Sequence, residues 1–132
     1  MEKTNFEKLE IYGLAENLSD EIWDIVIKWN DLAQNTVGKQ IVRAADSIGA
    51  NIAEGSGRGS DQDYRRFLRI ARGSLYETRH WLRRAFTRHL LTQEQINELT
   101  PLIEKLTPKL NAYLKAIGTY SSKTEVQSPK AI

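Results

Sequence analysis

The sequence predicts an all-α protein that folds as one antiparallel, up-down-up-down four-helix bundle. Its 132 residues suit a single domain, four stretches repeat apolar residues at helical spacing, and no stretch shows the two-residue alternation of a strand. Helices joined by short turns pack most simply with each antiparallel to the next. We therefore expect a bundle over residues 1–118 and a flexible C-terminal tail over residues 119–132.

The first two predicted helices carry apolar seams on either side of a break at residues 30–35. The first seam has a period near 3.5, typical of shallow helix packing, and consists of Ile11, Ala15, Leu18, Ile22, Ile25, Trp29 and Leu32. The second seam consists of Ile41, Ala45, Ile48 and Ile52. Gly55 lies where the second helix would end in a left-handed residue. Ser47 and Asn51, one turn apart, are expected to form a buried hydrogen-bond network.

A long third helix is predicted after the glycine-rich connector 55–59. Ser60 can cap the free N–H groups of its first turn, and the pattern can continue to about Leu90. Thr92 with Gln95 then gives a capping-box signal for a fourth helix.

The fourth helix keeps a steady alternation of three and four residues between apolar positions. Its seam consists of Ile96, Leu99, Ile103, Leu106, Leu110, Tyr113 and Ile117. Pro101 and Pro108 do not shift the phase of this pattern, so they predict kinks and not a chain break.

Composition and charge indicate which classes of protein the chain can belong to. The chain is 40% apolar and 27% charged, has no cysteine, and contains no apolar run near the ~18 residues that span a membrane. Its acidic start lacks the pattern of a signal peptide, so we expect a cytoplasmic protein without membrane contact. The net charge of +2 is segregated, because residues 1–36 carry −5 and residues 37–90 carry +6.

Most of the positive charge falls on one stripe of the third helix. At 100° per residue, a band ~80° wide and ~27 Å long contains Arg65, Arg69, Arg72, Arg79 and Arg83. Tyr76 lies within this stripe, while Arg58, Arg66, Arg84 and Arg88 lie at its margins. Arginine forks match phosphate oxygens, and an adjacent aromatic ring suits stacking with RNA or single strands. The alternative is a solvated face with ion pairs to the acidic first helix.

The apolar arc of the third helix is wider than one packing face needs. The expected core side contains Leu68, Ala71, Leu75, Leu82 and Phe86. A second apolar group contains Phe67, Ile70, Trp81 and Ala85. This group indicates a subunit interface, unless a deep position in the bundle covers it.

No catalytic or metal-binding arrangement is evident. His80 and His89 project from opposite faces of the third helix and cannot share a metal ion. Glu54 and Glu77 are more simply explained as ion-pair partners for arginines, Arg58 among them, than as an acid/base pair. The glycine-rich connector lacks the preceding strand and the lysine of a phosphate loop. We expect a non-enzymatic protein without cofactor or metal.

Two segments resemble a known family. Residues 43–58, RAADSIGANIAEGSGR, and residues 67–77, FLRIARGSLYE, are similar to the bacterial four-helix bundles named for 23S ribosomal RNA intervening sequences, also labelled S23 ribosomal protein. The resemblance implies a homo-oligomeric ring, a pentamer, and kinship with the accessory protein of diversity-generating retroelements. That kinship implies RNA or DNA and a protein such as a reverse transcriptase as partners. Gly49 departs from relatives that often carry proline there.

The functional hypothesis is a non-enzymatic oligomeric bundle that binds the nucleic-acid backbone through the arginine stripe, in an adaptor role. The alternative is a protein–protein scaffold in which the acidic first helix of one subunit meets the arginine face of another.

Overall fold

The protein is an antiparallel helical bundle in the computed structural model, which describes residues 6 and 9–127, with side chains as far as residue 117. The helices are α1 (Glu10–Val26), α2 (Asp31–Ala33), the π-helical segment η2 (Gln34–Gly38), α3 (Lys39–Ser56), α4 (Asp61–Thr87) and α5 (Gln93–Gln127). These described residues contain no strand. Because α2, η2 and α3 run on without leaving helical backbone geometry, they act as one helix.

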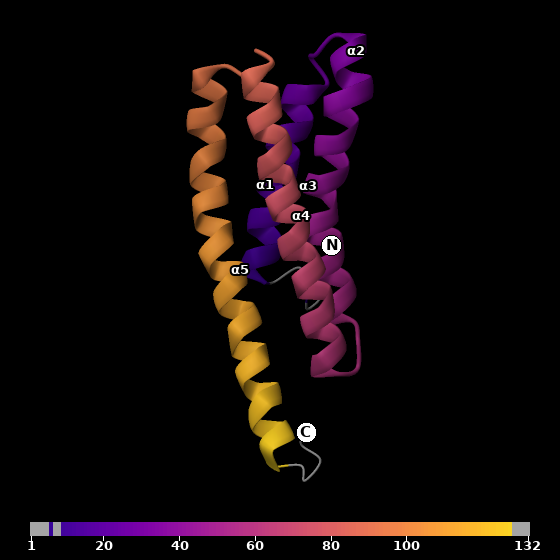
Figure 1. The fold of residues 1–132 in the computed structure, drawn as a ribbon, viewed down its shortest axis with the longest axis vertical. Helices are drawn as coiled ribbons and strands as arrows, with labels where there is room; N and C mark the ends of the chain where they lie inside the picture. The colour runs from indigo at the N-terminus through magenta and orange to yellow at the C-terminus, as the bar shows by residue number, and fades with distance from the viewer. Residues whose placement is uncertain (1–5, 7–8, 128–132) are drawn as a thin grey trace, which may run out of the picture.

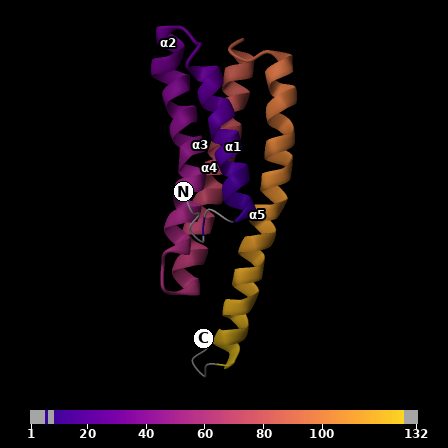
Figure 2. The same cartoon turned by 180° about the vertical axis from the view of Figure 1, so that it is seen from behind.

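Four long helical arms therefore run up, down, up and down (Figures 1 and 2). The arm formed by α3 packs against α1 and α4, and α5 also packs against α1 and α4. Helices α1 and α4 consequently lie across the diagonal of the bundle. The predicted fold class is confirmed.

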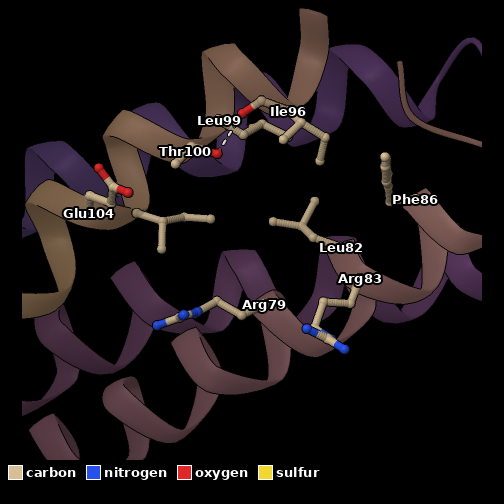
Figure 3. Close-up of a pocket in the computed structure, with 9 residues that line it drawn as sticks. Arg79, Leu82, Arg83, Phe86, Ile96, Leu99, Thr100 and Glu104 are labelled. Atoms are coloured by element: carbon tan, nitrogen blue, oxygen red, sulfur yellow. Dashed lines mark hydrogen bonds between the residues drawn. The ribbon is translucent and has the colours of Figure 1, made fainter. Parts of the chain in front are cut away.

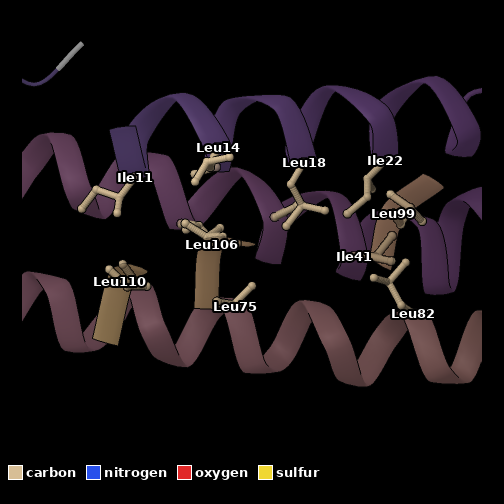
Figure 4. Close-up of a cluster of buried hydrophobic side chains, with 14 of the residues drawn as sticks. Ile11, Leu14, Leu18, Ile22, Ile41, Leu75, Leu82, Leu99, Leu106 and Leu110 are labelled. Carbon is tan, nitrogen blue, oxygen red and sulfur yellow. The ribbon is translucent and has the colours of Figure 1, made fainter. Parts of the chain in front are cut away.

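The core is a layered stack of leucine and isoleucine side chains from all four arms (Figure 4). The largest fully buried apolar residues are Leu18, Ile22, Ile41, Ile48, Ile52, Leu68, Leu75, Leu99, Leu106 and Leu110. Each such side chain contributes about 1.5–3 kcal/mol by leaving water. The predicted second seam is fully buried, and the fourth seam is buried or half-buried along its length.

The turn after α1 shows that the last residue of the first predicted seam, Leu32, lies outside the core. Helix α1 ends at Val26, and the next helix begins at Asp31, inside the predicted break. Asn30 caps that helix by accepting a hydrogen bond from the Ala33 N–H at 3.0 Å. Since the chain reverses here, Leu32 is 75% exposed and lies outside the core, contrary to prediction.

Gly55 does not end its helix, because α3 continues to Ser56 with right-handed backbone at the following residue. The glycine is buried where α3 approaches α4. A β-carbon at this position would lie 2.9 Å from Cβ of Phe67 and 3.0 Å from Cδ1 of Tyr64. The prediction of a left-handed terminator is therefore wrong, and the residue instead permits close packing of two helices.

A polar network joins the same two helices near their middle. The Asn51 amide donates to the Ser47 carbonyl at 2.8 Å and to its hydroxyl oxygen at 2.9 Å. The Ser74 hydroxyl of α4 donates to the Ser47 hydroxyl oxygen at 2.9 Å. The predicted hydrogen bonds are present and extend to Ser74, although Ser47 and Asn51 are half-buried and not fully buried as expected, and they fix the register of α3 against α4.

Both ends of α4 are defined by local hydrogen bonds. Ser60 accepts from the Asp63 N–H at 3.1 Å, as predicted. At the other end His89 has a φ of 62°, and the Leu90 N–H reaches back to the Ala85 carbonyl at 2.8 Å. This left-handed termination closes the helix slightly before the predicted end and turns the chain toward α5.

Helix α5 starts with the predicted capping box. The Gln95 N–H donates to the Thr92 hydroxyl oxygen at 3.1 Å, and the Thr92 N–H donates to the Gln95 side chain at 3.0 Å. Pro101 and Pro108 lie inside the helix, which confirms the absence of a chain break; the kinks stay a prediction.

The predicted end of the bundle at residue 118 is too early for the helix itself. Helix α5 continues to Gln127, because one glycine costs a helix only about 1 kcal/mol relative to alanine and no proline follows before that point. The flexibility predicted for residues 119–132 stays a prediction, and residues 128–132 lie outside the described part of the chain.

Two glycines give a matched test of helix packing. Gly73→Ala on α4 meets open space, so it is expected to raise the free energy of unfolding by about 0.5–1 kcal/mol through helix propensity. Gly55→Ala would force α3 and α4 apart, because its β-carbon would meet Phe67 and Tyr64. We expect this variant to lower the free energy of unfolding by about 1–3 kcal/mol, although its gain in helix propensity is the same. Urea unfolding measures both changes, and a stabilising Gly55→Ala would contradict the close approach.

The Glu21 carboxyl, on α1 near Glu98 of α5, gives a test of how the stability of the protein depends on pH. Burial, and then the nearby Glu98 and Asp24 carboxylates, raise the pKa of Glu21 above its ordinary value. The folded state thus favours the protonated carboxyl and loses stability as pH rises through that pKa. Glu21→Gln should raise the Tm at about pH 7 and leave it unchanged at about pH 3. Glu16→Gln, on the exposed side of α1, is the control, and an equal gain from both variants would contradict this assignment.

Candidate nucleic-acid interface

The arginine stripe lies on the side of α4 that turns toward α5 and solvent, and we call it the arginine face. It consists of Arg65, Arg69, Arg72, Arg79 and Arg83. Arg69, Arg79 and Arg83 are exposed, whereas Arg65 and Arg72 are half-buried. The Arg72 guanidinium donates to Oδ1 of Asn111 on α5 at 3.3 Å. The structure thus keeps the five predicted arginines together along one rod.

Most of this face is not neutralised by carboxylates. Within the described residues, Arg69, Arg72, Arg79 and Arg83 make no ion pair with a carboxylate. The described ion pairs join Arg58 to Glu54, Arg66 to Asp63 and Lys109 to Glu10. A row of uncompensated cations attracts counterions or a polyanion.

The topology explains why the described acidic residues of α1 do not pair with Arg69, Arg72, Arg79 and Arg83. Glu16, Asp20 and Asp24 are exposed on α1, which packs against α3 and α5. Since α4 lies across the bundle diagonal, the α1 carboxylates project from another side of the same subunit. Charge pairing between these helices would require two subunits.

Tyr76 lies within the arginine face and is 50% exposed. Its position on α4 is between Arg72 and Arg79, so the ring is available to a ligand bound along the face. Exposed aromatic rings beside cations are typical of surfaces that bind unpaired bases.

Arg58 does not join the arginine face. Its guanidinium pairs with the Glu54 carboxylate at 2.9 Å and lies 4.8 Å from the centre of the Phe67 ring. Arg66 lies 4.5 Å from the same ring and 3.7 Å from the Asp63 carboxylate. Phe67 is thus flanked by two guanidinium groups, and the Glu54 partner expected for Arg58 is confirmed.

The predicted subunit-interface group is partly covered by the subunit itself. Ala85 is fully buried and cannot contact a second copy, so its assignment to an interface is wrong. Phe67 and Trp81 are half-buried, and only Ile70, at 42%, is largely exposed. The close approach of α3 at Gly55 contributes to the cover of Phe67.

Glu77 also differs from expectation, since its carboxylate accepts a hydrogen bond from the indole N–H of Trp81 at 3.2 Å. His80 packs edge-on against the same indole, with ring centres 4.8 Å apart. Among the residues that the structure describes, no group of three histidine or acidic side chains could hold a metal ion.

A groove between α4 and α5 adjoins the arginine face (Figure 3). Its volume is about 340 Å³. Leu82, Phe86, Leu99 and Ile103 supply an apolar lining, while Arg79 and Arg83 stand on the α4 side. Thr100 and Glu104 stand on the α5 side. The groove therefore has cations on one wall, oxygen acceptors on the other and hydrocarbon between them.

Sequence reasoning missed this groove because it placed Phe86 in the core. The side chain is 40% exposed, since α4 and α5 do not close over its end of the bundle. Farther along, the Tyr64 and Tyr113 hydroxyls are 2.9 Å apart and their rings meet edge to face. Burial, then the hydrogen bond with Tyr113, raises the pKa of Tyr64. The tyrosine pair closes one end of the α4–α5 contact. The groove lies toward the other end of the two helices, near Phe86.

Two other surface hollows suit anions less well. The α1–α3 hollow is lined by Glu16, Asp20 and Asp46, and the Ser19 hydroxyl donates to the Asp46 carboxylate. The α3–α4 hollow combines Arg43 with Asp46 and Glu77. Carboxylates outnumber basic side chains in both hollows and oppose binding of phosphate, whereas the α4–α5 groove has two arginines and one carboxylate, so the arginine face is the better polyanion site.

Comparison with known proteins identifies the family. A family model described as 23S rRNA-intervening sequence protein matches residues 7–112. The chain belongs to this family. The match covers all of α4 and both walls of the groove, so the arginine face lies within the family's shared region.

A solved structure of the S23 ribosomal protein family shares the fold of this 23S rRNA-intervening sequence protein. It is a protein of unknown function from Bacteroides thetaiotaomicron VPI-5482, with 24% sequence identity and a TM-score of 0.70. The alignment covers 80% of this chain and 98% of that one. No curated protein matches the chain. Within the described residues, no helix combines the length and apolar character needed to cross a membrane.

Proposed function

We propose that the protein is a non-enzymatic, oligomeric, cytoplasmic bundle that binds the nucleic-acid backbone through the arginine face. The observation that supports this proposal is the row of arginines along α4, four of them without a carboxylate partner among the described residues. Guanidinium groups bind phosphate oxygens through paired N–H donors, and phosphate contacts dominate nucleic-acid affinity.

The length of the arginine row and the firm support of α4 strengthen the proposal. A straight helix spaces Arg65 and Arg83 about 27 Å apart, so the face can follow several consecutive phosphates. The polar network and the glycine contact hold α4 firmly against α3. The backbone that carries the arginines therefore loses little order on binding, and the ordering cost falls on the side chains.

The oligomer and protein-partner parts of the proposal rest on the family likeness. A ring, with the pentamer as the expected form, would bring several arginine faces together and increase avidity for one strand. A protein partner such as a reverse transcriptase, and kinship with the retroelement accessory protein, belong to the same proposal. An adaptor would use the nucleic acid and the protein partner at once.

A second candidate function is a protein–protein scaffold, which the charge distribution favours. Helix α1 exposes Glu16, Asp20 and Asp24 on one side, and α4 exposes arginines across the diagonal. Opposite charges on different sides of one subunit allow head-to-tail association. In that arrangement the arginines would be neutralised by the next subunit and no basic surface would remain.

Nucleic-acid binding by the arginine face is tested with two matched variants, each of which removes four positive charges. Arg69, Arg72, Arg79 and Arg83 are changed to Gln in one variant; the control changes four exposed bases elsewhere, Lys28, Lys39, Arg43 and Lys105. Fluorescence anisotropy measures RNA and DNA binding over a range of salt. If all five arginines contact phosphate, log K should fall with log salt at a slope of about −4.5 for a duplex. The arginine variant should flatten this slope by about 3.6, and the control should leave it unchanged.

Light scattering on the same variants separates the two candidate functions. Equal slopes for wild type and both variants would refute nucleic-acid binding by the arginine face. If the slopes are equal and the arginine variant dissociates the oligomer, the scaffold is the correct function.

A further inference from the structure

We propose that the α4–α5 groove binds an unpaired base, which makes single-stranded nucleic acid the ligand of the arginine face. This inference rests on the proposed function, because Arg79 and Arg83 belong both to the face and to the wall of the groove. It adds a base site to what would otherwise be a phosphate surface.

The apolar lining of the groove is incompletely covered within the subunit. Phe86 is 40% exposed, and Ile96 and Ile103 are only half-buried although they follow the core seam of α5. The groove volume of about 340 Å³ lies at the lower end of the range for small-ligand sites, about 300–1,000 Å³. A flat aromatic ring would cover this hydrocarbon and could contact the Phe86 ring.

The two walls offer different polar groups to the two parts of a nucleotide. Arg79 and Arg83, on the α4 wall, provide N–H donors for the phosphates that flank an inserted base. Opposite them, the Glu104 carboxylate can accept from the exocyclic amino group of cytosine or adenine. The Thr100 hydroxyl already donates to the Ile96 carbonyl at 2.7 Å, so its oxygen also remains as an acceptor.

The charged groups on the two walls of the groove favour a nucleotide over an apolar helix as its ligand. A purely apolar helix from a partner would leave Arg79, Arg83 and Glu104 without complementary groups, whereas a nucleotide supplies an anion, a ring and donors in one unit. In a duplex the ring faces are stacked and the edges are paired, so only an unpaired base can enter. Tyr76, farther along the face and 50% exposed, offers a second ring for stacking.

The test compares three polyanions of equal length with the full chain and two variants. The probes are a single strand of adenine and cytosine, the same strand with abasic sites in place of all bases, and a blunt duplex. Phe86→Ala removes the ring from the groove. Trp23→Ala, at a 54% exposed aromatic residue on α1, is the matched control, and circular dichroism checks that both variants fold.

The wild-type protein should bind the single strand about 5- to 150-fold more tightly than the abasic strand, the range expected for one stacked base. Phe86→Ala should sharply reduce that preference, because only stacking on Tyr76 remains, while leaving affinity for the abasic strand and the duplex unchanged. Trp23→Ala should retain it. A third variant, Glu104→Gln, is tested with an added thymine strand of the same length. It should reduce the preference for the adenine–cytosine strand over the thymine strand, because a carboxylate is the better acceptor for an amino group.

Three results overturn the inference. Salt-dependent binding that is equal for the abasic and normal strands, with no effect of Phe86→Ala, removes the base site but leaves the phosphate surface intact. A change in oligomer mass caused by Phe86→Ala, with strand preference unchanged, assigns the groove to a second copy of the chain. An absence of binding to all three probes refutes the proposed function as well.

Discussion

The structure depends on the diagonal placement of α1 and α4 that an up-down-up-down bundle imposes. Each helix of such a bundle contacts its two neighbours along its length, while the helix across the diagonal meets it only through the core. The acidic helix and the arginine-rich helix occupy such a diagonal. Their charges therefore cannot cancel within one subunit, and the protein has oppositely charged surfaces on different sides despite a net charge of only +2.

The two neighbours of α4 contact it in different ways. Helix α4 packs closely against α3, because Gly55 has no side chain to separate the two helices and a hydrogen bond joins Ser74 to Ser47. Against α5 it is joined at one end by the tyrosine pair and left open at the other, where Phe86 borders the groove. One side thus holds the arginine rod in place, and the other gives a ligand access to hydrocarbon beside the cations.

Periodicity and capping predicted the fold class, the seams of α3 and α5 and the starts of α4 and α5, since these depend on local spacing and on side chains within one turn. They predicted a break at residues 30–35 but still placed Leu32 in the core seam, and they did not predict the burial of Ala85, because both outcomes depend on how distant helices meet. The grouping of the arginines followed from helix geometry alone. The lack of carboxylate partners for Arg69, Arg72, Arg79 and Arg83 among the described residues required the bundle topology, and the groove required the observation that α5 leaves Phe86 uncovered.

Arginine footprinting with phenylglyoxal, read by mass spectrometry, tests most directly the central claim that Arg69, Arg79 and Arg83 have no carboxylate partner among the described residues. Arg69, Arg79 and Arg83 should react readily in the free protein, and added single-stranded RNA should slow their modification while Arg43 on α3 keeps its rate. The account would be contradicted if the α4 arginines were protected before any RNA was added and became reactive only at high salt. Such a result would mean that the acidic helix of a neighbouring subunit already neutralises them.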